Sequence, residues 1–257
     1  MLINLFRSVK SARAEQSILS RHRSLLFLAT LLAFSVHAES FAVDFELLHE
    51  QEIALPDPLD SEGWTVASKE GDVTISMRSW PDSDFYAIKI DQTFDTNLSN
   101  VVGHLLDDSR YKNWIPDLKS ARIIRQLDEQ KSRSVYMHLE MPWPLDDRDS
   151  IIGQRITQNP ETLVVTIKEW NEGASLPEKH DVVRSPRINS EYVLIPLSPN
   201  KVRSIWQGHQ EPGGSVPSFL VNWMIDNIYE ESAANMQVQF EDPALKHELD
   251  WIADLQQ

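Results

Sequence analysis

Residues 141–149 read Met-Pro-Trp-Pro-Leu-Asp-Asp-Arg-Asp and lie between two strand-like stretches, residues 133–140 and 149–158. In the first stretch, apolar side chains fall on alternate positions, at Val135, Met137 and Leu139. Side chains of a strand alternate between its two faces, so this stretch has one apolar face. One apolar face per strand predicts an antiparallel sheet that covers apolar material on one side only.

Further short strands are predicted on both sides of this stretch. They cover residues 73–77, 85–90, 120–127, 162–169, 189–196 and 201–209. Residues 97–107 carry apolar side chains at helical spacing, and Asp95 and Thr96 are the candidate N-caps of that helix. Residues 171–188 contain two prolines and a glycine and are predicted to form a long loop, of the kind that often acts as a lid.

The chain closes with helices. Residues 211–223 read Glu-Pro-Gly-Gly-Ser-Val-Pro-Ser-Phe-Leu-Val-Asn-Trp. This pattern predicts a turn, a cap at Ser215 and a long helix that runs to about residue 240. A second helix is predicted over residues 242–255. Strands followed by a long helix on one face of the sheet indicate the α+β class.

Three stretches together resemble the START (StAR-related lipid-transfer) family. They are Gly63-Trp64, residues 141–149 and residues 211–223, and they occur in the family's order. The resemblance implies a helix-grip fold over residues 61–257, in which a curved antiparallel sheet wraps around the C-terminal helix and leaves a ligand cavity between them. It assigns structural roles in the family's motifs to Trp64, Arg148, Asp149, Pro212, Gly213 and Gly214.

The resemblance also implies a lipid or sterol-like partner and a role in transport, sensing or sequestering. Strand alternation and the helix face select six cavity-lining candidates, each of which could instead be solid core: Met137, Leu139, Ile152, Gln154, Met224 and Ile225. Trp143 and the loop 171–188 are candidates for the cavity mouth; the alternatives are hairpin packing for Trp143 and a plain solvated loop.

Gln154 departs from the family pattern, because some members carry an arginine there. Arg155 has the opposite strand parity and should face away from the cavity. Without that arginine the cavity loses a charge-assisted contact to phosphate, which favours a neutral or weakly polar ligand.

The sequence offers no catalytic or metal-binding pattern. Cysteine is absent, no Gly-x-Ser-x-Gly motif surrounds Ser215 or Ser218, and His104, His138 and His209 lack metal-ligand spacing. We therefore expect no cofactor and no catalysis. Two alternatives are a helix-grip enzyme of the cyclase or hydrolase kind and a protein-interaction module with a filled cavity.

Residues 1–38 have the features of a signal peptide. Arg21 and Arg23 precede an apolar run that ends in Val36-His37-Ala38, so cleavage after Ala38 and export to the periplasm or the exterior are predicted. The alternative is a retained membrane anchor. Residues 39–60 are predicted to be a leader with a short helix at 41–52.

The rest of the chain is strongly acidic. Residues 39–257 hold 19 Lys and Arg against 38 Asp and Glu, a formal charge of −19. Such a charge argues against a nucleic-acid partner, and it predicts that any contact with a membrane is transient and made by apolar side chains.

Overall fold

The computed structural model describes residues 54–128 and 131–256, without the side chains of residues 218–227. The strands of this part of the chain form one ten-stranded sheet. The strands follow the order β1-β2-β3-β10-β9-β7-β6-β5-β4 with antiparallel pairing, and the short β8 pairs with β6 in parallel. Their bounds are β1 (Thr65–Glu70), β2 (Val73–Ser79), β3 (Tyr86–Phe94), β4 (Leu118–Leu127), β5 (Ser132–Leu139), β6 (Asp147–Gln158), β7 (Val165–Asn171), β8 (Val182–Arg184), β9 (Arg187–Ser198) and β10 (Lys201–Glu211).

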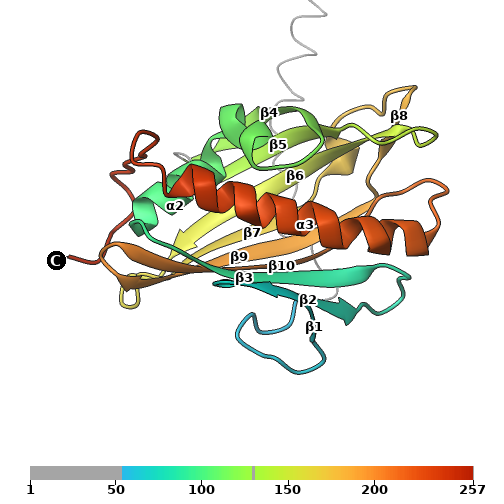
Figure 1. Cartoon of the computed structure of the whole chain (residues 1–257). Coiled ribbons are helices and arrows are strands. Elements are labelled where there is room, and N and C mark those ends of the chain that lie inside the picture. The colour runs from blue at the N-terminus through green and yellow to red at the C-terminus, as the bar shows by residue number, and fades with distance from the viewer. Residues whose placement is uncertain (1–53, 129–130, 257) are drawn as a thin grey trace, which may run out of the picture. The chain divides into compact units, whose positions relative to one another are not determined.

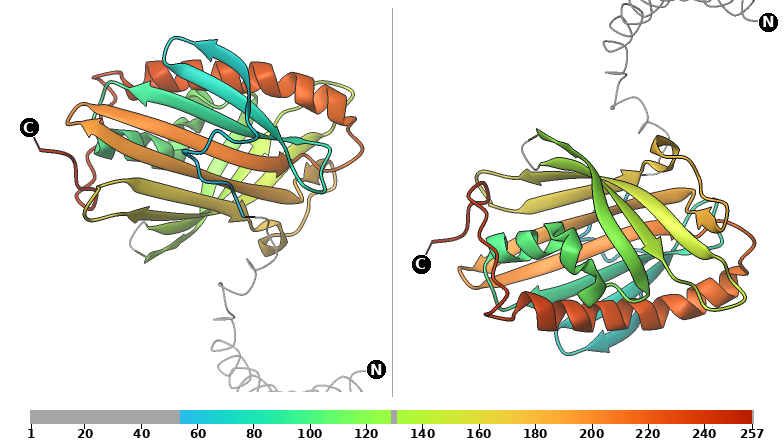
Figure 2. Two further views of the ribbon diagram at one scale, coloured as in Figure 1. Left: turned by 90° about the horizontal axis from the view of Figure 1, so that it is seen from below. Right: turned by 90° about the horizontal axis from the view of Figure 1, so that it is seen from above.

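The helices lie on the concave face of the curved sheet (Figure 1). The long helix α3 (Ser218–Phe240) crosses this face, and α2 (Leu98–Leu106) lies beside the C-terminal end of α3 (Figures 1 and 2). The 3-10 helix η1 (Asp108–Asn113) connects α2 to β4, and η3 (Gly173–Ser175) follows β7. The predicted α+β helix-grip architecture is confirmed.

The apolar core lies between the sheet and these helices. One cluster joins α2 and the end of α3 to the sheet through Phe94, Val101 and Phe240, which are all fully buried. A second cluster packs β2, β3 and β10 against the middle of α3 through Ile75, Ile88, Ile90, Trp206 and Ala233. The apolar side chains that alternate along the strands thus pack between the sheet and the helices and form the core.

The caps of the two main helices differ from the predictions. Asn97, and neither Asp95 nor Thr96, caps α2: its Oδ1 accepts a hydrogen bond of 3.1 Å from the Asn100 amide. Helix α3 begins at Ser218 after Pro217, and no side chain caps it, so the predicted cap at Ser215 is wrong.

Strand β7 begins three residues later than predicted. The Asn159 side chain accepts hydrogen bonds from the amides of Glu161 and Thr162 at 2.8 and 3.0 Å. Leu163 consequently lies in a tight turn, with a φ of 59°. The side-chain contacts of Asn159 therefore prevent an extended backbone where the apolar alternation predicted one.

The predicted second C-terminal helix is wrong, because residues 242–256 cross α2 in an irregular path. Side chains of α2 take the backbone donors that a helix would need: His247 N donates to Asn100 Oδ1 and Leu249 N to Ser99 Oγ, both at 2.7 Å. Asp254 in turn accepts from the Ser99 amide at 2.9 Å. The apolar spacing of this tail serves packing against α2.

The predicted signal peptide and the helix at 41–52 lie outside the described residues. Within the described residues, no helix has the length and apolarity that a membrane span requires.

Candidate ligand-binding cavity

A cavity of about 260 Å³ lies between the concave face of the sheet and α3. Six strands, β3, β5, β6, β7, β9 and β10, contribute side chains to its sheet side. The helix side is formed by Ile228, Tyr229, Ser232 and Met236 of α3, and Leu105, Tyr111 and Trp114 line the end near α2. Most of the lining is apolar, as is usual for small-molecule sites.

Four of the six residues predicted from strand and helix patterns line this cavity. They are Met137 and Leu139 on β5 and Ile152 and Gln154 on β6. Their positions follow from strand alternation, and Arg155 accordingly faces away and is exposed. The other two, Met224 and Ile225, fall on α3 where the side chains lie outside the described residues.

A hydrogen-bonded polar group is built into the cavity wall around Gln154. Gln154 Oε1 accepts from Arg133 Nε, and Gln154 Nε2 donates to Glu169 Oε1, both at 2.6 Å. Ser190 Oγ donates to the other Glu169 oxygen at 2.7 Å. The buried amide therefore links a guanidinium to a carboxylate, and both of its polar atoms have partners.

Arg133 was missed by the sequence analysis. It pairs with Gln154 across the β5–β6 ladder and is 4% exposed. Its other nitrogens donate to Tyr111 Oη at 2.5 Å and to the carbonyls of Leu105 and Leu106 at 3.2 and 2.5 Å, where α2 ends. Arg133 shares the strand parity of Val135, Met137 and Leu139, and this signal could have identified it as an inward-facing side chain.

Arg133 lies close to the cavity wall, but the described lining residues include no Lys, Arg or His. An arginine does lie beside Gln154, supplied by the neighbouring strand. All three guanidinium nitrogens, however, donate to protein oxygens, and Arg133 itself is not part of the lining. Gln154 binds both Arg133 and the Glu169 carboxylate, and a cation at the C-terminal end of a helix is stabilised by the helix dipole.

The tyrosines at the cavity are neutral. Burial raises the pKa of Tyr111 to about 12 and raises the pKa of Tyr192 and of Tyr229 as well. Each phenol therefore keeps its proton across the physiological range. The cavity presents an apolar surface with hydroxyl, amide and carboxylate groups at a few points.

Trp143, predicted to lie at the mouth, does not line the cavity, but its hairpin borders it. Glu140 and Met141 of the same β5–β6 connection are lining residues, together with Pro116 and Asp117 of the η1–β4 connection. The Trp143 side chain is 93% exposed. A solvated indole next to a cavity-lining segment is notable, because large apolar side chains are normally covered.

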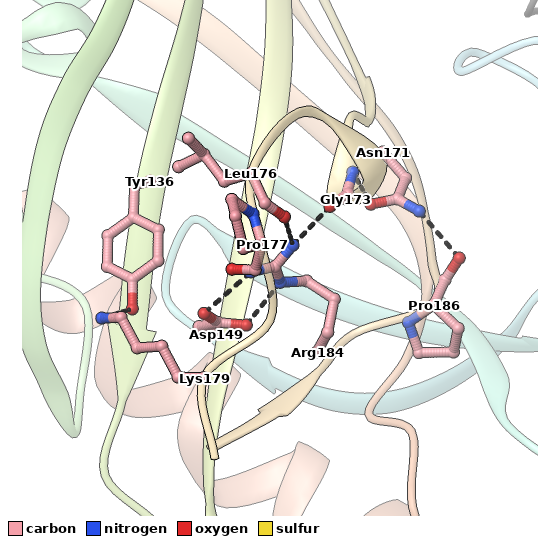
Figure 3. A network of polar contacts seen from close by, with 9 residues as sticks. All are labelled: Tyr136, Asp149, Asn171, Gly173, Leu176, Pro177, Lys179, Arg184 and Pro186. Carbon is pink, nitrogen blue, oxygen red and sulfur yellow. Dashed lines mark hydrogen bonds and ion pairs between the residues drawn. The ribbon is translucent and has the colours of Figure 1, made fainter. Parts of the chain in front are cut away.

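The loop 171–188 does not line the cavity, contrary to the expectation that it forms the mouth. Arg184 fixes it to the outer face of the sheet, with hydrogen bonds of 2.5 and 3.2 Å to the two oxygens of Asp149 (Figure 3). The same guanidinium donates to the carbonyls of Gly173, Leu176 and Pro177. Lys179 Nζ donates to Tyr136 Oη at 2.5 Å and lies 4.4 Å from the ring centroid.

The residues of the family motifs make structural contacts. Asp149 is 1% exposed and holds Arg184, and Arg148 Nη2 donates to the carbonyl of Gly213 at 3.3 Å. Gly213 and Gly214 follow Pro212 and have φ values of 69° and 66°, a conformation that favours glycine. The Trp64 ring, before β1, packs under Lys89 Nζ at 4.6 Å.

The three singled-out histidines lie outside the cavity lining. His104 stacks on Phe240 with ring centroids 4.7 Å apart. His138 Nε2 lies 2.8 Å from Asp147 Oδ2, and His209 Nε2 lies 3.0 Å from Ser83 Oγ. Within the described residues, no cluster of three or more His, Asp or Glu side chains is placed to hold a metal ion.

The model of the START domain family matches residues 49–241 of this chain. The chain belongs to the START domain family. Bovine phosphatidylcholine transfer protein is 19% identical over 176 residues, which cover 66% of this chain and 80% of that protein. An uncharacterized protein of Pseudomonas aeruginosa is 24% identical over 162 residues, covering 63% of this chain and 79% of the relative.

Solved structures of START proteins share the fold. The STAR-related lipid transfer protein of Xanthomonas axonopodis superposes with a TM-score of 0.64 at 22% identity, covering 70% of this chain and 99% of that one. Human STARD10 also gives 0.64, at 17% identity, with 75% and 82% covered. Several of these START homologues are named as lipid-transfer proteins.

Proposed function

We propose that this START domain binds one neutral, hydrophobic small molecule of the lipid or sterol class in its cavity and transfers it without chemical change. The observation that carries the proposal is the apolar cavity itself, bounded by the sheet and α3. A protein-interaction module with a filled cavity would have no such space.

Charge and size support a neutral ligand of modest dimensions. Among the described residues the lining contains no Lys, Arg or His for a phosphate, and the nearby guanidinium of Arg133 is bound by protein oxygens. A volume of about 260 Å³ lies just below the range of roughly 300–1,000 Å³ typical of ligand sites. A lipid with two long acyl chains would need considerably more space than a ring system or a single chain.

Native mass spectrometry of residues 39–257, followed by organic extraction, tests the proposal. We expect a bound mass at a ratio of about one to one, which dissociates as a neutral lipid. Protein that is bare after purification, and after incubation with mixed lipids and sterols, would refute the carrier function. A bound phospholipid would preserve the carrier function and refute the neutral ligand.

We further propose that Trp143 makes the transient contact with a membrane during transfer. Its indole is almost fully exposed on the hairpin whose residues Glu140 and Met141 line the cavity. Indole rings favour the membrane–water interface, where the apolar ring and the N–H group both find suitable surroundings. Apolar contact also suits a domain whose negative charge is repelled by anionic headgroups.

We also propose that the protein is exported, with cleavage after Ala38. Basic residues, an apolar run and Val36-His37-Ala38 support this. Fractionation of the producing cells with N-terminal sequencing tests it. We expect Glu39 as the first residue of the protein outside the cytoplasm, whereas an intact N-terminus in the membrane fraction would favour the retained anchor.

A further inference from the structure

The polar side chains of the cavity wall differ in whether they can still bind a ligand. The amide of Gln154 uses both of its polar atoms, in hydrogen bonds of 2.6 Å to Arg133 and to Glu169. The hydroxyl of Tyr111 donates to the Leu105 carbonyl at 2.7 Å and accepts from Arg133. These groups have little hydrogen-bonding capacity left for a ligand.

The hydroxyl groups of two other lining residues, Tyr192 and Tyr229, remain available. Both side chains line the cavity and are only partly buried. Neither hydroxyl has a hydrogen-bond partner among the described residues, and neither is one of the fully occluded polar atoms that lack a partner. A phenol that is accessible and unpartnered can donate a hydrogen bond to a molecule in the cavity.

Tyr192 lies on the floor of the cavity, in the middle of the sheet. It belongs to β9, which runs between β10 and β7, and it pairs across these ladders with Trp206 and Ile167. Its side chain packs against both apolar clusters, the one beside α2 and the one beside the middle of α3. A ligand atom bound by this hydroxyl therefore has apolar surface on both sides.

The charges around the cavity define what the Tyr192 hydroxyl can bind. Burial, reinforced by the negative charge of Glu169, raises the pKa of Tyr192 well above its ordinary value, so the phenol keeps its proton and acts as a donor. The lining includes the acids Asp117, Glu140 and Glu169, and no Lys, Arg or His among its described residues. An anionic acceptor would be repelled by these carboxylates, whereas an uncharged oxygen would not.

The serines of the lining, Ser150 and Ser232, are weaker donors for such an oxygen. An aliphatic hydroxyl is less acidic than a phenol and forms weaker hydrogen bonds as a donor. Ser232 also lies on α3, where a serine hydroxyl can turn to a carbonyl of its own helix. The phenol of Tyr192 has neither of these disadvantages.

We infer that the Tyr192 hydroxyl donates a hydrogen bond to an uncharged oxygen of the ligand, so that the ligand is a neutral lipid with a ketone or ester carbonyl between two apolar parts. The carbonyl supplies the acceptor that the phenol lacks, and the apolar parts extend along the two clusters. This inference rests on the proposed function and specifies its ligand class.

The test uses two probes of the same shape, dibutyl ketone and the alkene in which a C=CH₂ group replaces its carbonyl. Each probe displaces N-phenylnaphthylamine, a neutral apolar dye, from the protein spanning residues 39–257, and the Kd of the dye is measured for each variant. The quantity compared is the Kd of the alkene divided by the Kd of the ketone. The solvation of each probe in water is the same for every variant, so it cancels from this comparison.

Tyr192→Phe removes only the hydroxyl. We expect the ratio to fall by at least about fivefold in this variant, because the ketone oxygen is then buried without its donor. Retained binding of the alkene shows that the cavity of the variant is intact. Tyr86→Phe is the matched control, because Tyr86 is 39% exposed and lies outside the lining, and it should leave the ratio unchanged.

The outcomes separate the two proposals. An unchanged ratio in Tyr192→Phe, or a fall confined to Tyr229→Phe, would overturn the role of Tyr192 and leave the carrier function standing. Bound dye that neither probe displaces from the wild type would overturn the ligand class alone. A wild-type protein that binds neither the dye nor the probes would overturn the carrier function as well.

Discussion

Replacing Arg133 with methionine should destabilise the protein strongly, because the guanidinium serves three parts of the fold at once. It donates to Gln154, whose amide in turn binds Glu169; it donates to the Tyr111 hydroxyl; and it donates to the last carbonyls of α2. Methionine fills a similar volume but supplies none of these donors.

The expected loss is about 3–5 kcal/mol in the free energy of unfolding. The substitution leaves the acceptors of Gln154, Leu105 and Leu106 without their donor, and each buried polar group left unpaired costs about 1–3 kcal/mol. A single domain has a total stability of about 5–15 kcal/mol, so the change is a large fraction of the whole. Urea denaturation followed by tryptophan fluorescence and circular dichroism measures it.

Two further variants test the reasoning. Arg155→Met removes an exposed arginine of β6 and should change stability by no more than about 0.5 kcal/mol. Adding Glu169→Gln to Arg133→Met removes the uncompensated carboxylate, and it should restore about 1–3 kcal/mol. A loss below about 1 kcal/mol for Arg133→Met would refute the structural role of its hydrogen bonds, and no recovery in the double variant would refute an electrostatic influence of Arg133 on Glu169.

Three other predictions concern transfer, pH and the outer loop. Trp143→Ser should slow lipid transfer between vesicles several-fold without changing the Kd of the ligand, and an unchanged rate would contradict the membrane role of this indole. Burial, reinforced by His247, lowers the pKa of His104 to about 4, so the folded state binds fewer protons than the unfolded state and stability should decrease as pH falls from about 6.5 toward 4. His104→Phe should show a shallower decrease in pH-dependent urea titrations; the same slope as the wild type would show that other groups cause it. Arg184→Met should increase hydrogen exchange in its loop at residues 171–188 by at least tenfold, and exchange that stays as slow as in the wild type would show that Asp149 does not anchor the loop.

The fold was predictable because its signals are local and repeated. The alternation of Val135, Met137 and Leu139 fixes which face of β5 is buried, and the same rule placed Ile152 and Gln154 in the cavity wall. The glycines at 213 and 214 mark a turn that requires positive φ values, and that turn comes shortly before α3. These features depend on residues a few positions apart.

The errors arose where distant side chains act on the backbone. Asn100 and Ser99 capture the amides of the C-terminal tail, and no local pattern in that tail reveals them. The role of Arg133 depends on carbonyls of α2 and on a carboxylate two strands away. The position of the loop depends on Arg184 meeting Asp149, a contact over 35 residues of sequence. Such pairings are specified by the tertiary fold.

The pairing of β3 with β10 determines when the domain can form. These strands are adjacent in the sheet, yet Asp91 and Ile205 pair across more than a hundred residues of chain. Strands β1 to β3 therefore cannot pair with the remainder of the sheet until β10 has been synthesised. Helix α3 and the tail that crosses α2 are synthesised later still. Contacts of such large sequence separation make folding slow. A polypeptide that cannot close its sheet before its synthesis is nearly complete lacks its final fold throughout translation, and an incompletely folded chain is what a translocation channel would accept if the proposed export occurs.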